Sequence, residues 1–529
     1  RFGHSVFLET EATARFESLE RAAALLAPRL PAGVRAAKLR GRAELSGKYG
    51  LHRTSQETTD NLDATLSLQA IELDQVVDGH PLRILAEARI DLAGPSRDPR
   101  FAADIRSSVG KLAFPGLSVA AADVRIVASG VRSGLDISRL DARLAGLVID
   151  AAEGKRISFD TATLAAKGCL DLAGKNAALT SLEARLPGLA PLRLSGRLGF
   201  GKNRSARLQL ESRGLDVAAL RRIASPFVPA GFADWDLAAR ADLSLGYRGG
   251  ATMGDWGVSG TISLTGATFN DPSFTVAGEG LDPTFRFDGV PAASKGLAFT
   301  GALDIGHGES LWKAVYVSWS QHPLKLTTAG RYDPASAVVD GLAVRAILPE
   351  IGTIAASGTA NLLPALSFDL RTEADLSLGP LYSLYSQVGV SEEKRMKLQG
   401  KLGADLRIRK DGAALSIAGR IKLADTDLER PLTETLLVGI SADLPVRYDS
   451  AQRPGEAQDA ALPEEGYLRV NDFSNKFLSF KAVDIPLRAG VNALGLEPVS
   501  LELFGGRLEL GRMTFRYNPG DGSFHGLGS

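Results

Sequence analysis

Residues 398–423, LQGKLGADLRIRKDGAALSIAGRIKL, decide the fold class of this chain. Apolar residues occupy alternate positions from Leu398 to Ile408 and again from Leu415 to Leu423, with charged or polar residues between many of them. A period of two places the apolar side chains on one face of a strand and the charged side chains on the other. The Lys410-Asp411-Gly412 stretch between the two runs is a hairpin signal. The stretch therefore predicts two long antiparallel strands with one apolar and one polar face.

The same alternation recurs through most of the 529 residues, and turn signals such as Gly249-Gly250 and Asn270-Asp271-Pro272 separate the runs. We therefore expect a mostly-β protein built on an elongated, twisted antiparallel sheet. One face of this sheet is polar and exposed to solvent over hundreds of residues, and the apolar face must be shielded from water. The sheet would curl into a U-shaped trough with its apolar face inside.

Helical signals are few. A helix that ends at Pro28 or Pro31 is predicted by the spacing of Phe16, Leu19, Ala23, Leu26 and Leu30. A second helix is expected from Asp216, as its N-cap, to Pro226. A third is expected to start at Pro380 and to carry Leu381, Leu384, Tyr385 and Val388.

A long alternating strand follows each predicted helix, so the chain reads as a helix plus meander repeated about every 160–200 residues, far above solenoid periods. We expect four segments, of which the first (1–50) holds a helix and the first long strand. The others are a β-groove segment (51–210), a helix plus second β-groove segment (211–372) and a helix plus C-terminal segment (373–529). Residues 450–466 are polar and are expected to form a surface loop.

Composition excludes several classes of protein. Lys plus Arg number 61 and Asp plus Glu number 61, so the chain lacks the basic excess of a nucleic-acid binder. The apolar share of 44% is too high for bulk disorder. The single cysteine, Cys169, excludes an intrachain disulfide and a cysteine-based zinc site. No catalytic constellation is present, and we expect no enzyme activity, no metal and no cofactor.

A pair of glycines near the C-terminus shifts the parity of the alternation. Leu501 and Leu503 precede Gly505-Gly506, and Leu508 and Leu510 follow the pair. Glycine inside a strand marks a bulge that bends the sheet. Gly505 and Gly506 are therefore predicted to form a corner that helps to curve the sheet.

The segment around these glycines, VSLELFGGRLEL at residues 499–510, resembles a Phe-Gly-Gly-Arg strand pair found near the C-terminus of AsmA-like proteins. The helix-then-meander repeats, such as residues 215–220, are also similar to this superfamily, which includes the TamB, YhdP and YdbH branches. The resemblance is closest to the YdbH branch. It implies a U-shaped β-groove, called a β-taco, that spans the Gram-negative periplasm and carries phospholipids between the inner and outer membranes.

The resemblance also implies an inner-membrane anchor N-terminal to this sequence and a small outer-membrane lipoprotein as partner at the C-terminal end. Acyl chains would fill the apolar lining, because each buried methylene contributes about 0.8 kcal/mol. The alternative that the residues leave open is a periplasmic scaffold or assembly factor for outer-membrane proteins. The candidate lining consists of Leu140, Leu144, Leu192, Leu194, Leu243, Leu245, Leu398, Leu402, Leu406, Ile408, Leu415, Ile417, Ile421, Leu423, Leu501, Leu503, Leu508 and Leu510.

Overall fold

The computed structural model of the chain is mostly β, as the alternation predicts. It describes residues 6–528 except 22–37, 55–56, 78–79, 115, 132, 151–155, 201–203, 224, 226–233, 251–253, 293–295, 314, 364, 387–395, 453–461, 504–505 and 520–522. The chain forms two compact units. Unit 1 comprises Arg1–Ala233 and Arg240–Val258, and unit 2 comprises Asp234–Ala239 and Ser259–Ser529. The strands at 236–249 and 256–270 cross these bounds, and each is described with the unit that holds most of its residues.

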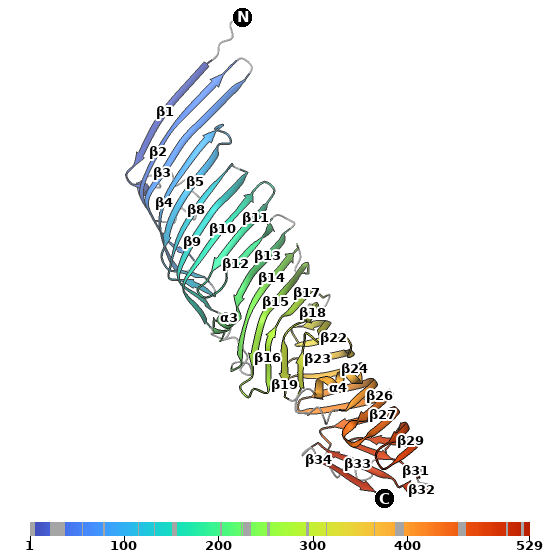
Figure 1. Cartoon of the computed structure of the whole chain (residues 1–529). Coiled ribbons are helices and arrows are strands. Elements are labelled where there is room, and N and C mark those ends of the chain that lie inside the picture. Colours follow the sequence, from blue (N-terminus) through green and yellow to red (C-terminus); the bar gives the residue numbers. More distant parts are fainter. Residues whose placement is uncertain are drawn as a thin grey trace. The chain divides into compact units, whose positions relative to one another are not determined.

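Unit 1 is an antiparallel meander in which each long strand pairs with the next (Figure 1). A short hairpin, β6–β7, is inserted between β5 and β8, and β7 also pairs with β9. The strands are β1 (Val6–Phe16), β2 (Lys38–Arg53), β3 (Thr58–Val77), β4 (His80–Gly94), β5 (Arg100–Val109), β6 (Leu112–Phe114), β7 (Leu117–Val119), β8 (Ala121–Val131), β9 (Gly134–Asp150), β10 (Arg156–Asp171), β11 (Asn176–Arg185), β12 (Leu192–Gly199), β13 (Ser205–Asp216) and β14 (Asp236–Gly249).

Unit 2 is a second antiparallel meander, which runs through β15, β17, β18 and β21–β30 to β33 and β34. Strands β16, β19 and β20 form a side branch, and β31–β32 is a separate hairpin. The strands are β15 (Trp256–Asn270), β16 (Val276–Leu281), β17 (Pro283–Pro291), β18 (Leu297–Ile305), β19 (Glu309–Trp312), β20 (Val315–Ser318), β21 (Leu324–Asp333), β22 (Val338–Leu348), β23 (Gly352–Asn361), β24 (Ser367–Ser377), β25 (Lys397–Asp411), β26 (Ala414–Arg430), β27 (Thr435–Asp449), β28 (Glu464–Ser474), β29 (Ser479–Gly490), β30 (Ala493–Leu496), β31 (Val499–Leu503), β32 (Gly506–Leu510), β33 (Met513–Asn518) and β34 (Ser523–Gly528).

Several strands contain a residue with a left-handed backbone, and the residue that follows it is buried. The left-handed residue adds one position to the strand, as in a β-bulge, so the side chain that follows it returns to the apolar side of the strand. The pairs are Ala70 and Ile71, Gly146 and Leu147, and Gly214 and Leu215 in unit 1, and Gly266 and Ala267, Gly280 and Leu281, Asp425 and Thr426, Gly439 and Ile440, and Ala482 and Val483 in unit 2.

Three of these glycines share a second feature. The backbone N–H of Gly439 donates to Asp427 Oδ1 at 2.8 Å, across from β27 to β26. In the same way, Gly214 N–H donates to Asp242 Oδ1 at 2.7 Å and Gly266 N–H to Asp282 Oδ1 at 2.8 Å. A bulge disrupts the ladder locally, and these carboxylates satisfy the amide that the ladder leaves unpaired.

Two short helices lie at the same end of the strands as most bulges. Helix α3 (Val217–Ile223) follows β13 directly, and Asp216 Oδ1 accepts from Ala219 N–H at 3.0 Å, so the predicted N-cap is confirmed. Helix α4 (Leu378–Ser386) follows β24 directly and contacts β24, β25 and β20. We call this end of each unit the helix end and the opposite end the rim.

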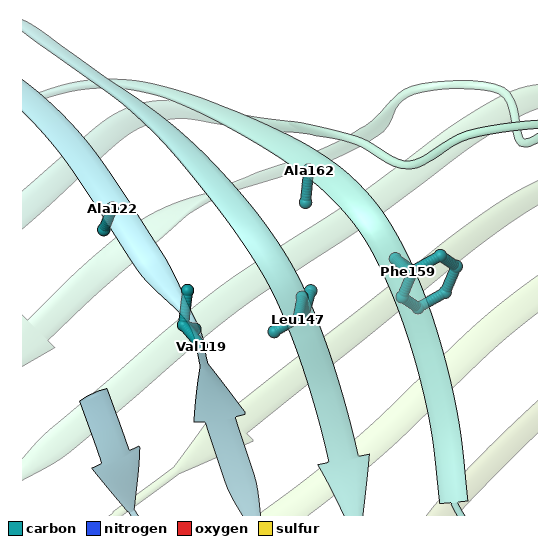
Figure 2. Close-up of a cluster of buried hydrophobic side chains, with 5 residues drawn as sticks. All are labelled: Val119, Ala122, Leu147, Phe159 and Ala162. Atoms are coloured by element: carbon teal, nitrogen blue, oxygen red, sulfur yellow. The ribbon is translucent and has the colours of Figure 1, made fainter. Parts of the chain in front are cut away.

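The buried cores sit at the helix ends. In unit 1 the core is formed by Val119, Ala122, Leu147, Phe159 and Ala162, on neighbouring strands (Figure 2), with Leu112 of β6 and Ile223 of α3 packed against it. In unit 2 the core is formed by Ile351, Leu376 and Leu384, with Leu402, Leu381 and Val317 among the residues packed against it.

The structure corrects four details of the expected organisation. Phe16 is the last residue of β1, not part of a helix, and most of the first predicted helix lies outside the described residues. The third helix starts at Leu378, two residues before Pro380. Residues 464–466 of the expected polar loop begin β28. Strands β31 and β32 pair antiparallel, with Leu503 opposite Gly506, so they form a hairpin and not one bent strand.

Candidate functional site: the apolar sheet faces

An unbroken apolar row crosses every long strand of unit 1 on one face. Residues that face one another across adjacent strands lie on the same side of a sheet. Successive cross-strand partners from β1 to β14 are Phe16, Ala43, Leu68, Ala88, Ile105, Ile126, Leu140, Ala166, Leu182, Leu194, Leu210 and Leu245. We call this side of the sheet the apolar face, and the opposite side the polar face.

Unit 2 carries a corresponding row from β17 to β27. Its members are Phe285, Leu303, Leu326, Ala346, Ile354, Ala374, Ala404, Ile421 and Leu444. Bulges shift the register within several strands, yet the apolar residues stay on one side. Each unit thus presents a wide apolar surface.

Fourteen of the eighteen predicted lining residues lie on these apolar faces: the six in unit 1 and the eight in β25 and β26. All fourteen are half-buried. Strand neighbours cover part of each side chain. Leu144 and Leu402 also pack against the cores of unit 1 and unit 2, whereas the other twelve join neither core among the described residues. Away from the helix ends, the apolar faces therefore keep accessible hydrocarbon surface that a ligand could cover.

Leu402 differs from the rest of its strand. It packs against the core that Ile351, Leu376 and Leu384 form beneath α4. Its side chain therefore belongs to the core of unit 2, whereas Leu406 and Ile408, further along the same face, do not join that cluster.

The four C-terminal residues of the predicted lining are elsewhere. Leu501, Leu503, Leu508 and Leu510 belong to the separate hairpin β31–β32, outside the meander. Leu508 and Leu510 are exposed. Gly506 is the first residue of β32, and Gly505 lies outside the described residues. The structure does not bring this group together with the other lining residues.

The polar faces are held by cross-strand ion pairs. On β24 and β25, Arg371 donates two hydrogen bonds to Asp405, at 3.1 and 2.8 Å, and Arg407 donates two to Asp369, at 2.8 and 2.6 Å. The hydrogen bond from Arg407 lowers the pKa of Asp369 against the opposing effect of burial. In unit 1, the hydrogen bond from Arg125 lowers the pKa of Asp104 in the same way.

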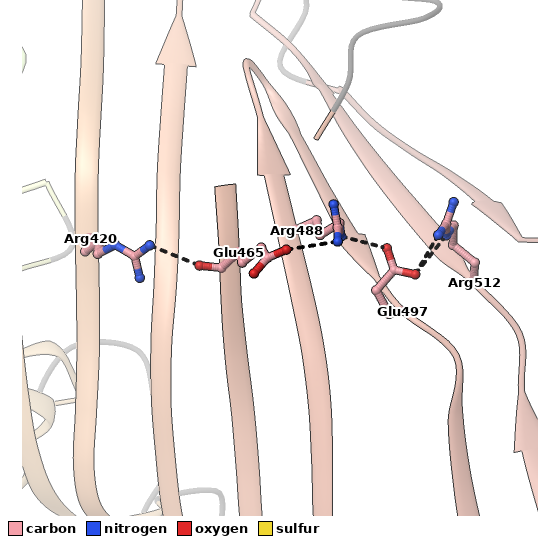
Figure 3. A network of polar contacts seen from close by, with 5 residues as sticks. All are labelled: Arg420, Glu465, Arg488, Glu497 and Arg512. Atoms are coloured by element: carbon pink, nitrogen blue, oxygen red, sulfur yellow. Dashed lines mark hydrogen bonds and ion pairs between the residues drawn. The ribbon is translucent and has the colours of Figure 1, made fainter. Parts of the chain in front are cut away.

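A longer network lies near the C-terminus of unit 2 (Figure 3). Arg420 donates to the backbone oxygen of Glu465 at 3.0 Å, and the Glu465 carboxylate accepts from Arg488 at 3.0 Å. Glu497 then joins Arg488, at 3.4 Å, to Arg512, at 2.6 Å. Such exposed pairs contribute little individually, but bidentate and networked pairs favour one strand register over its neighbours.

Each polar face also has a hollow where side chains are short. The unit 1 hollow, about 860 Å³, is bounded by residues such as Arg106, Asp123 and Arg143 around Thr163 and Ala165. The unit 2 hollow, about 680 Å³, centres on small residues such as Thr300, Ala302, Ala329 and Ala343. Charged side chains surround both hollows.

Three further findings bear on chemistry. Within the described ranges, no group of His, Cys, Asp and Glu could hold a metal ion. In the same part of the chain, no helix has both the length and the hydropathy to cross a bilayer. Comparison with protein-family models, curated proteins and solved structures finds no match to this chain.

The sequence reasoning missed two features of this surface. The first is the set of left-handed residues that precede a buried residue in the strands. An apolar–x–Gly–apolar pattern, as in Leu144-Ala145-Gly146-Leu147, marks several of them in the sequence. The second is Lys410, a cation that continues the apolar series of β25. Both could have been found by following the parity of each strand to its end.

Proposed function

We propose that the chain is a lipid carrier of the Gram-negative periplasm that moves phospholipids along a hydrophobic groove between the inner and outer membranes. The observation that carries the proposal is the unbroken apolar row across the strands of each unit, most of whose members keep exposed surface and, away from the helix ends, have no covering layer among the described residues. A soluble domain normally buries such a surface against a second layer. Here acyl chains would supply that layer.

The energetics favour retention of lipid with free movement along the sheet. A phospholipid with ~30 methylenes, half covered by the apolar face, gains on the order of 10 kcal/mol relative to water. Neighbouring positions along the row offer similar Leu, Ile and Ala side chains, so a shift by one strand changes the free energy little. The resemblance to the AsmA-like superfamily supports the same function, with membrane attachment and a lipoprotein partner outside this sequence.

The proposal can be tested with a cross-strand pair on the apolar face. Ile408 and Ile417 face one another on β25 and β26. We expect the double variant I408D/I417D to lose the phospholipid that native mass spectrometry detects on the purified wild-type chain. The matched control, R409D/S416D, changes the next cross-strand pair, on the polar face, and should retain the lipid.

Two results would contradict the proposal. One is a wild-type chain that is free of lipid after purification from Gram-negative membranes and after incubation with phospholipid vesicles. The other is equal lipid occupancy in both double variants. Copurified outer-membrane polypeptides in place of lipid would support the assembly-factor function.

A further inference from the structure

The apolar face of unit 2 carries a cation at its rim. Lys410 continues the even-numbered series of β25 beyond Leu406 and Ile408, and its cross-strand partners are Phe368 on β24 and Leu415 on β26. Its side chain is half-buried. Among the described residues of these three strands, Lys410 is the charged residue that interrupts an otherwise uncharged apolar series from Leu402 to the rim.

Lys410 also has no anionic partner within the described part of the chain, whereas Arg407 and Lys397, on the polar face of β25, pair with Asp369 and Glu429. Glu464, which lies at the rim on the apolar side of β28, has Arg447 at 3.5 Å. An ammonium at the border of an apolar surface is strongly attracted to an anion, because the surrounding hydrocarbon does not screen the charge. The stem of Lys410 can pack along the apolar face while its ammonium points to the rim.

The distance from Lys410 to the helix end is long enough for the acyl chains of one lipid. Eight residues separate Lys410 from Leu402, which corresponds to about 26 Å of strand at ~3.3 Å per residue. Leu402 packs against the core beneath α4, so the uncovered part of this apolar strip, between Leu402 and Lys410, is shorter than about 26 Å. The acyl region of one leaflet is about 15 Å thick, half of the hydrocarbon core of a bilayer. Acyl chains therefore fit between the lysine and the helix.

We propose that Lys410 binds the phosphate of a glycerophospholipid whose acyl chains lie along β25, β24 and β26 towards α4. This inference rests on the proposed lipid-carrier function and adds the orientation of the lipid and a headgroup contact. The phosphate sits at the rim, in reach of water, and the chains cover Ile408, Leu406 and Ile417. Leu402 and α4 close the far end, so longer chains must bend or leave the strip.

The test separates the headgroup contact from the apolar contact. The probes are two lipids with the same acyl chains, phosphatidylglycerol and diacylglycerol, each with a fluorescent label on one chain. We expect K410Q to weaken phosphatidylglycerol binding about tenfold, the loss typical of one charge-assisted hydrogen bond. Diacylglycerol binding should stay unchanged, because that lipid has no phosphate. K410R, which keeps the charge, should bind phosphatidylglycerol as the wild type does.

K401Q is the matched control, because Lys401 lies on the same strand but on the polar face. It should bind both lipids normally. The inference is overturned if K410Q binds phosphatidylglycerol as tightly as the wild type, or if it loses both lipids equally, which would indicate a general disturbance of the strip. A wild-type chain that binds neither lipid overturns the carrier function itself, and a chain that binds diacylglycerol alone overturns the headgroup contact but not the carrier function.

Discussion

The two halves of β25 have the same sequence pattern and different surroundings. At the helix end, Leu402 packs against a core of Ile351, Leu376 and Leu384 under α4. At the rim, Ile408 faces Leu370 and Ile417 and joins no core cluster. Both residues have half-buried aliphatic side chains on the same face of the strand. The difference teaches that hydrophobic alternation alone does not separate residues that hold the fold from residues that are free to bind a ligand.

The largest expected effect comes from placing a carboxylate in each half of β25. L402D places a carboxylate against the core beneath α4 and should lower the free energy of unfolding of unit 2 by about 3 kcal/mol. I408D should lower it by no more than about 1 kcal/mol, because its carboxylate can reach water. Urea unfolding followed by circular dichroism measures both. Equal losses in the two variants would mean that the rim half is as much a part of the core as the helix half.

A second pair of variants compares a closely packed glycine near the rim with an open one near the helix end. A Cβ on Gly358 would lie 2.0 Å from the backbone oxygen of Asp369, and the φ of Gly358 is +154°. G358A should therefore cost about 2–4 kcal/mol of stability, since the clash is with backbone. A Cβ on Gly403 would meet nothing nearer than 3.9 Å, so G403A should change stability by less than about 1 kcal/mol. Thermal unfolding of the two variants would show whether this difference exists.

The bulge at the helix end supplies a smaller effect. D427A removes the carboxylate that accepts the Gly439 N–H at 2.8 Å and leaves that amide without its partner. We expect a loss of about 1–2 kcal/mol. D411A, in the rim turn between β25 and β26, is the control and should be nearly neutral. Hydrogen exchange at the Gly439 amide should speed up in D427A, and unchanged exchange there would argue against the proposed role of the carboxylate.

The smallest effect concerns the polar face and pH. The hydrogen bond from Arg407 holds the folded-state pKa of Asp369 below its ordinary value of 3.8, against the opposing effect of burial. The stabilisation is thus present above pH 3.8 and is lost as pH falls through the folded-state pKa. The urea midpoint should fall less between pH 5 and pH 2.5 in D369N than in the wild type. A D369N curve parallel to the wild-type curve would show that this ion pair contributes nothing.

Much of the fold could be predicted, because strand alternation is a local property. The two strands expected on either side of Asp411-Gly412 are β25 and β26, and they pair as an antiparallel hairpin. The Asp216 N-cap could be predicted for the same reason, since an N-cap depends on neighbouring residues only. The β31–β32 hairpin could not, because a glycine pair in an alternating run suits both a bulge and a reversal.

The candidate site was predicted in part. The parity of Leu406, Ile408, Ile417 and Ile421 places them correctly on one face. That Leu402 belongs to a core depends on how α4, the element before β25, packs on the sheet and on Ile351, which comes from the segment before β23. The left-handed residues Asp425 and Ala482 are also hard to foresee, since neither residue type marks a bulge as glycine does.

The sequence by itself determined the class of structure and the division of each strand into an apolar and a polar side, because a period of two is enforced by backbone geometry residue by residue. Only the tertiary structure decided which apolar residues are covered. Coverage requires contacts between residues distant in the chain, such as Ile351 with Leu384. Register, bulges and helix placement set these contacts, and the alternation of apolar and polar residues does not encode them.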